Sequence, residues 1–187
     1  MKRWAMLCGV MLLFAGIASA QDESPKAEVF AGYSFARLGA NGLDVNLNGG
    51  SASVSYNPIP WLGLVGDFGG YHGGTDFGNG DLYTYLFGPK VAFRHGPITP
   101  FVQTLFGGAH ATATASTCPS VAGVHPETCV SGSASENSFA MALGGGLDWN
   151  ATPHIGVRLI QAEYLMTQFG STTQNGVRIS AGVVFRF

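Results

Sequence analysis

The stretch that decides the fold is NGVRISAGVVFRF at residues 175–187, in which large apolar residues alternate with small or charged ones. An extended strand would place one apolar set on a single face: Val177, Ile179, Ala181, Val183, Phe185 and Phe187. The opposite face would carry Arg178, Ser180, Gly182 and Arg186. A period of two predicts a β-strand that separates an apolar environment from a polar one.

The same alternation recurs along the chain and predicts eight strands, at 28–37, 49–57, 61–71, 81–94, 100–115, 136–149, 154–168 and 176–187. Gly, Pro, Asn and Asp gather between these runs, as turns require. Short connections (NPIP, HGPIT, NATP) alternate with long ones (GANGLDVNLN, HGGTDFGNG and residues 116–135), and GSTTQN is intermediate. This alternation predicts an antiparallel up-and-down barrel with tight turns at one end and long loops at the other.

The orientation of the apolar face decides between two kinds of barrel. A soluble calycin-like barrel would hold its large apolar residues inside, whereas a transmembrane barrel would expose them to lipid. The interior of eight strands is just wide enough to be filled by side chains, and this many Phe, Tyr, Leu and Met residues would overfill it. We therefore predict an all-β, closed eight-stranded transmembrane β-barrel, closed because an open edge in hydrocarbon would leave amide groups unpaired.

Charged residues within the strands fall mostly on the small, glycine-rich face and would point into the barrel. We expect them to form a network of mixed sign, since isolated buried charges are costly. The predicted members are Glu28, Asp67, Lys90, Arg94, Asp148, Arg158, Glu163, Arg178 and Arg186. Arg158 and Glu163 cannot both point inward under a strict period of two, so a β-bulge is expected near Ile160. The pattern leaves open which face His110 occupies.

The first 20 residues have the features of a secretory signal peptide: Lys2 and Arg3, an apolar run, and the cleavage site Ala18-Ser19-Ala20. The alternative, a membrane anchor, would need about 20 apolar residues. Residues 21–27 would form a short periplasmic leader before a barrel of residues 28–187.

Two cysteines follow the signal segment, Cys118 and Cys129, and in an exported protein they most simply form a disulfide. The alternative is a metal site with His110 or His125, but these spacings match no tetrahedral zinc pattern.

Composition excludes several classes of protein. The 187 residues are 46% apolar and 11% charged, unlike a disordered chain, and the 28 glycines show no collagen period. The formal net charge of −2 argues against a nucleic-acid partner.

Four segments together resemble the small outer-membrane β-barrel family related to OmpA-type barrels: AEVFAGYSFARL, WLGLVGDFGGY, LFGPKVAFR and PFVQTLFGG. The terminal alternation ending on Phe187 resembles the signal that the barrel-assembly machinery recognises, with Phe185 and Phe187 as its aromatic residues. The resemblance covers residues 28–187 and implies the outer membrane of a Gram-negative cell. It departs from full-length OmpA in having no peptidoglycan-binding domain after Phe187, so no cell-wall tether is expected.

The resemblance implies a structural or surface-exposed membrane protein, with narrow porin-like passage of small solutes as the alternative and a lipid-modifying enzyme as the third possibility. A lipid A deacylase of this fold would need His, Ser and an acid close together, and no histidine stands in a His-x-Ser arrangement. We therefore expect no enzyme, cofactor or metal site. The expected partners are outer-membrane lipid, lipopolysaccharide and the assembly machinery, with the protein a monomer.

Overall fold

The computed structural model describes residues 25–40, 43–75, 78–94, 96–117, 130–169 and 172–187. It contains the eight predicted strands, each close to its expected position. Their bounds are β1 Ala27–Ala40, β2 Leu43–Ile59, β3 Leu62–Thr75, β4 Gly78–Ala92, β5 Ile98–Thr117, β6 Val130–Asn150, β7 Ile155–Phe169 and β8 Thr172–Arg186. Among the described residues, none belongs to a helix of the length and hydropathy needed to cross a bilayer.

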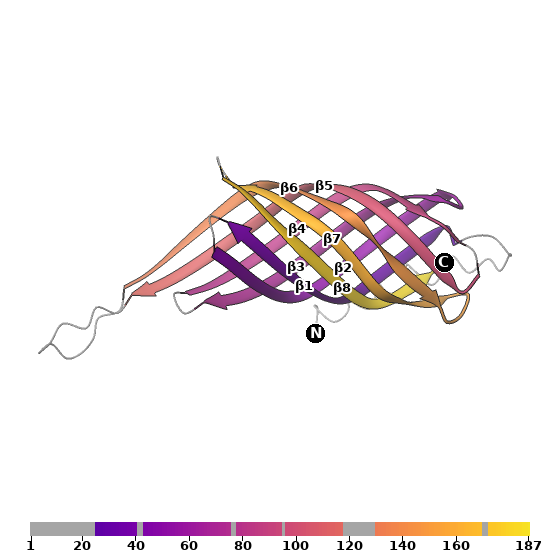
Figure 1. The fold of residues 1–187 in the computed structure, drawn as a ribbon, viewed down its shortest axis with the longest axis horizontal. Coiled ribbons are helices and arrows are strands. Elements are labelled where there is room, and N and C mark those ends of the chain that lie inside the picture. The colour runs from indigo at the N-terminus through magenta and orange to yellow at the C-terminus, as the bar shows by residue number, and fades with distance from the viewer. Residues whose placement is uncertain (1–24, 41–42, 76–77, 95, 118–129, 170–171) are drawn as a thin grey trace, which may run out of the picture.

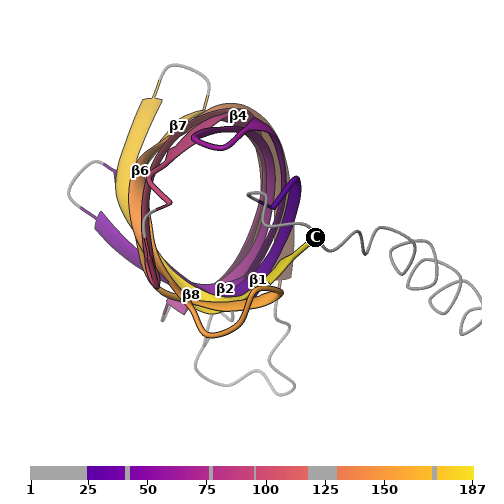
Figure 2. The ribbon, with the colours of Figure 1, turned by 90° about the vertical axis from the view of Figure 1, so that its right-hand side faces the viewer.

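The strands form a closed barrel in which each strand pairs antiparallel with the next along the chain. The first and last strands close it through a ladder that runs from Glu28 opposite Arg186 to Gly39 opposite Asn175. The strands are tilted along the barrel in Figure 1 and form a complete ring in the end view of Figure 2. The predicted closed up-and-down barrel is therefore confirmed.

Three of the predicted longer connections are instead mostly strand. The ladders run to Ala40 opposite Leu43, to Thr75 opposite Gly78, and to Phe169 opposite Thr172. The expectation of long loops at the first two places, and of an intermediate one at GSTTQN, is wrong. Gly, Asn and Asp favour turns when considered alone, but here a neighbouring strand supplies the hydrogen bonds that keep the backbone extended.

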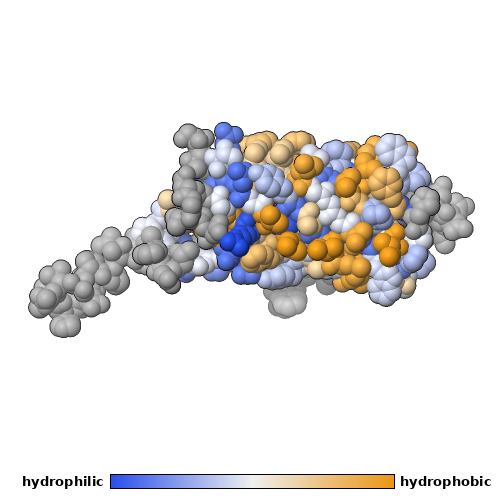
Figure 3. All heavy atoms as spheres, viewed as in Figure 1, coloured by the Kyte–Doolittle hydropathy of each residue, from blue (hydrophilic) through white to orange (hydrophobic). Residues whose placement is uncertain are grey.

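The outer wall carries an apolar band, as predicted. Phe139, Leu143 and Phe185 are all exposed on it, and apolar residues gather over the middle of the wall and its short-turn end in Figure 3. On the β4 side the band extends from Tyr83 to Phe93, which is about 33 Å of strand at ~3.3 Å per residue. With a tilt of about 40°, this corresponds to roughly 25 Å along the axis, the height of the lipid-facing band of transmembrane barrels.

The interior differs from the expectation of a small and charged face. It also holds an apolar cluster with six leucines, most of which lies toward the long-loop end. The members are Ala36, Leu38, Leu47, Val65, Tyr71, Leu82, Leu86, Leu105, Ala109, Ala140, Ala142 and Leu165. Large residues fit because glycines on facing strands leave room for them; a Cβ on Gly73 would lie 2.5 Å from the side chain of Leu47.

The β-bulge expected near Ile160 is confirmed. The register between β7 and β8 shifts between Arg158 and Gln161, and Leu159 and Ile160 are both exposed. The extra residue returns Arg158 and Glu163 to the same, inward face, where both are buried.

Candidate functional site

The charged residues of the barrel interior are the candidate functional site. Eight of the nine predicted members are buried, and the ninth, Arg94, is largely buried at the barrel end. The structure divides them between two groups. The mid-barrel cluster consists of Asp67, Tyr71, Gln103, Glu163 and Arg178. The mouth cluster, at the short-turn end, consists of Glu28, Ser55, Lys90, Arg94, Asp148, Arg158, Gln161 and Arg186.

Arg178 is the centre of the mid-barrel cluster. Its Nη1 donates a hydrogen bond of 2.6 Å to Asp67 Oδ1, and its Nε donates one of 2.7 Å to Glu163 Oε2. The same Nη1 lies 3.2 Å from the Tyr71 hydroxyl oxygen. Gln103 Nε2 donates to the other oxygen of Glu163 at 2.8 Å. A buried guanidinium and buried carboxylates need such pairing, because isolated buried charges are costly.

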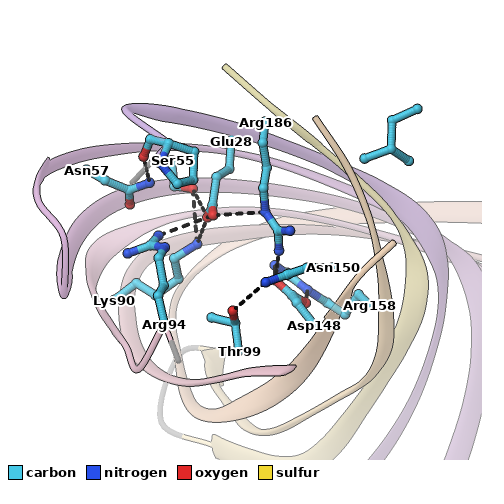
Figure 4. Close-up of polar contacts among 12 residues, drawn as sticks. Glu28, Ser55, Asn57, Lys90, Arg94, Thr99, Asp148, Asn150, Arg158 and Arg186 are labelled. Atoms are coloured by element: carbon cyan, nitrogen blue, oxygen red, sulfur yellow. Dashed lines mark hydrogen bonds and ion pairs between the residues drawn. The ribbon is translucent and has the colours of Figure 1, made fainter. Parts of the chain in front are cut away.

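Glu28 forms ion pairs with three cationic side chains in the mouth cluster, as Figure 4 shows. Lys90 Nζ lies 2.5 Å from Glu28 Oε2, while Arg94 Nη2 and Arg186 Nε lie 3.2 and 3.5 Å from Oε1. Ser55 Oγ donates to Glu28 Oε2 at 3.3 Å. These side chains come from β1, β2, β4, the residues after β4, and β8, so the cluster ties together strands on several sides of the barrel.

Arg158 joins an ion pair to an aromatic stack. Its Nε and Nη2 donate to the two oxygens of Asp148 at 2.8 and 3.1 Å, and its Nη1 donates to Gln161 Oε1 at 2.6 Å. The guanidinium lies 4.4 Å from the ring centroids of both Phe30 and Phe101. A planar cation between two aromatic faces is held by cation–π attraction as well as by its carboxylate partner.

The prediction from sequence missed the neutral partners of these charges: Tyr71, Gln103, Gln161, Phe30 and Phe101. Strand parity was the available signal on β3, because Tyr71 follows Asp67 by four residues. On β5 parity did not indicate Phe101 or Gln103, because the sequence did not decide which face of that strand points inward. Leu82 and Leu86 share the inward face of β4 with Thr84 and Lys90 by the same rule.

Neighbouring side chains occupy the space beside several glycines of the inward face. A Cβ on Gly69 would lie 2.6 Å from the ring of Tyr71, and one on Gly146 would lie 2.8 Å from that of Phe101. A Cβ on Gly156 would lie 2.9 Å from the guanidinium of Arg186. These positions do not leave the water-filled pockets that a glycine-rich interior could suggest. At these three positions neighbouring side chains occupy the space that the missing side chain leaves.

His72 and His110 make their hydrogen bonds on the outer face of the barrel and not with the interior charges. The side chain of His110 points outward, and its Nδ1 lies 2.8 Å from Asn137 Oδ1, which answers the question that the sequence left open. His72 Nδ1 lies 2.7 Å from Asp81 Oδ1 on the exposed surface. Within the described ranges there is no group of three or more His, Cys, Asp or Glu side chains placed to hold a metal ion. Cys118, Cys129 and His125 lie outside these ranges.

Many solved structures share this fold, among them the following three. Neisserial surface protein A matches with a TM-score of 0.65 and 15% identity, over 87% of this chain and 97% of that chain. Ail, the attachment invasion locus protein of Yersinia pestis, matches with a TM-score of 0.56 and 23% identity, over 87% of this chain and 99% of that chain. OprG from Pseudomonas aeruginosa matches with a TM-score of 0.53 and 10% identity, over 88% and 97% of the two chains.

The sequence comparisons give the family. No curated protein matches the chain significantly. Residues 6–187, in contrast, match the family described as the outer membrane protein beta-barrel domain. This match takes in every strand of the barrel, and it agrees with the lipid-facing apolar band and the closed ladder. The chain therefore belongs to the outer membrane protein beta-barrel domain family.

Proposed function

We propose that this protein is a non-conducting outer-membrane barrel that holds its β5–β6 hairpin out from the cell surface as a contact element. The observation that carries this proposal is the length of the hairpin, whose ladder continues to Thr117 opposite Val130. From Phe139 at the edge of the apolar band to Val130, β6 adds about 30 Å of strand at ~3.3 Å per residue. Residues 132–137 are all exposed, and Figure 1 shows β5 and β6 extending beyond the other strands.

The packed interior supports the non-conducting part of this proposal. The apolar cluster lies across the lumen on the long-loop side and the mouth cluster on the short-turn side. Planar-bilayer recordings of the purified protein should show no stepwise conductance, while a sixteen-stranded porin recorded under the same conditions serves as the positive control. Reproducible steps from the folded protein would overturn the closed lumen and favour passage of small solutes.

Labelling of intact cells tests the exposure of the hairpin. Lysines are scarce, and those that follow the signal segment are Lys26 and Lys90. The backbone carbonyl of Lys26 accepts a hydrogen bond from the backbone N–H of Asn57 at the short-turn end. Lys90 is buried. A Ser133→Lys variant should react with a membrane-impermeant amine reagent on intact cells, whereas the natural chain should react only after permeabilisation. Equal labelling of both, or no labelling of the variant, would contradict the proposed display.

We infer no enzymatic role. Two of the described histidines, His72 and His110, are paired with Asp81 and Asn137 on the outer wall. Mass spectra of lipid A from cells that express the protein should match those from cells without it. A shift in mass that depends on expression would reverse this inference and support a lipid-modifying enzyme.

Export and assembly complete the proposal. We infer cleavage after Ala20, leaving residues 21–27 as a periplasmic leader, and β1 begins at Ala27, close to this boundary.

Phe185 and Phe187 are exposed at the end of β8, where we propose that the barrel-assembly machinery recognises them. In the membrane we propose a monomer, surrounded by lipid and by lipopolysaccharide in the outer leaflet. The mass of the exported protein tests the cleavage site.

A disulfide between Cys118 and Cys129 would close the tip of the hairpin. These residues lie in the connection between β5 and β6, on the side of the protein that we place outside the cell, where the environment permits disulfides. Peptide mapping under non-reducing conditions should recover the two cysteines in one linked species. Recovery of both as free thiols would remove the disulfide without affecting the proposal for the barrel.

A further inference from the structure

The outer part of β6 has one unpaired edge. β7 pairs with β6 as far as Phe139 opposite Gln168, and the chain then turns back into β8 at Phe169 opposite Thr172. On its other side, β6 continues to pair with β5 up to Val130. Across the part of the chain that the structure describes, no strand therefore lies beside the β7-facing edge of residues 130–137, and its backbone groups are available to another strand.

This edge lacks the features that usually prevent strand addition. Edge strands are commonly protected by lysine, proline, a bulge or a covering segment. Residues 130–138 read VSGSASENS, with Glu136 as their single charge and no proline. The β5–β6 ladder runs through them without a register shift. Small side chains at 132–135 would allow another backbone to approach closely.

We propose that this edge pairs antiparallel with the same edge of a second copy of this chain. The inference rests on the proposed exposure of the hairpin. The segment SGSAS at 131–135 is nearly palindromic, so a two-fold axis through Ser133 sets Ser131 opposite Ser135 and Gly132 opposite Ala134. Glu136 then faces Val130, and no like charges are opposed. A surface that is complementary to itself is the requirement for a two-fold interface.

The same geometry places the two copies in different membranes. The two-fold axis of an antiparallel pair is perpendicular to the strands, so the two barrels lie at opposite ends of the joined sheet. Because the hairpin extends away from its barrel (Figure 1), the contact would connect two cell surfaces. Each pair offers backbone hydrogen bonds and little apolar burial, and many pairs between two surfaces would add avidity. A foreign strand would use the same backbone groups but would not need the palindromic side chains.

Charge exchange at the two-fold axis tests the proposal. Ser133→Glu places two carboxylates opposite each other in the pair, and Ser133→Lys places two ammonium groups there. Phosphatidylcholine vesicles containing the natural chain should cluster, as measured by light scattering. Vesicles with either variant alone should lose the clustering, and a mixture of the two should regain it. Thr114→Glu is the matched control, because Thr114 lies opposite Ser133 on β5, one strand away from the edge, and its vesicles should still cluster.

Heat-modifiable gel mobility must first show that each variant is folded. A mixture that stays dispersed, or a loss of clustering in the Thr114→Glu control, would overturn the self-pairing. Natural-chain vesicles that stay dispersed would also overturn it and leave a foreign strand as the occupant of the edge. Labelling of Ser133→Lys on intact cells separates these outcomes from a failure of the proposed surface display.

Discussion

Removing Arg178 should cause a large loss of stability, because its guanidinium is paired with two buried carboxylates. Its side chain is inaccessible to solvent and lies 2.6 Å from Asp67 and 2.7 Å from Glu163. Arg178→Met would leave both carboxylates in the barrel interior without the guanidinium that is hydrogen-bonded to them. Breaking a buried ion pair costs about 3–5 kcal/mol, which lowers the folding equilibrium constant by roughly two to three and a half orders of magnitude.

A neutral replacement of the whole group is the matched control. The triple variant Asp67→Asn, Glu163→Gln, Arg178→Met removes every charge, and complete replacement of a buried ion pair is often nearly neutral. Urea unfolding in phospholipid vesicles measures all three proteins. The signal is fluorescence from the exposed Trp61 in the β2–β3 turn and from Trp149 on the outer wall. If Arg178→Met unfolds within about 1 kcal/mol of the natural chain, or the triple variant is no more stable than the single one, the pairing argument fails.

Three further predictions concern the interior, the wall and the terminus. Gly69→Ala should cost about 1–3 kcal/mol by overpacking, since its Cβ would lie 2.6 Å from a tyrosine ring and 2.7 Å from a threonine hydroxyl. Gly132→Ala, with nothing within 4 Å, should change stability by less than about 0.5 kcal/mol in the same urea titration; equal costs would refute the packing argument. Leu143→Arg should cost about 2–4 kcal/mol on the lipid face, whereas Ser135→Arg, outside the band, should be almost neutral, and the reverse order would contradict the placement of the band. Phe187→Ser should lower the amount of folded barrel in cells, measured by heat-modifiable mobility of membrane fractions, but not the refolding yield in detergent; unchanged levels in cells would remove its role as an assembly signal.

Alternation in the sequence was sufficient to locate the strands and to orient the wall. The period of two in β8 and β6 placed Phe185 and Leu143 on one face, and the structure has both exposed. The conflict of parity between Arg158 and Glu163 was enough to place a bulge near Ile160. These features depend on neighbours within one strand, which the sequence shows directly.

The partners across the barrel could not be predicted in the same way. Arg178 and Asp67 are 111 residues apart in the chain, and nothing in the sequence says that this arginine reaches Asp67 while Arg158 reaches Asp148. The inward Leu86 and Leu105 were missed as core because alternation within a strand does not show how much room the facing strands leave.

The sequence by itself determined the eight strands, their lipid-facing side and the membership of the interior charges, because side chains alternate across a strand with a fixed period. The tertiary structure decided the ion-pair partners, the filling of the lumen and the unpaired edge of β6. Those features depend on the register and tilt with which the strands close into a ring, and these are set by all eight strands together.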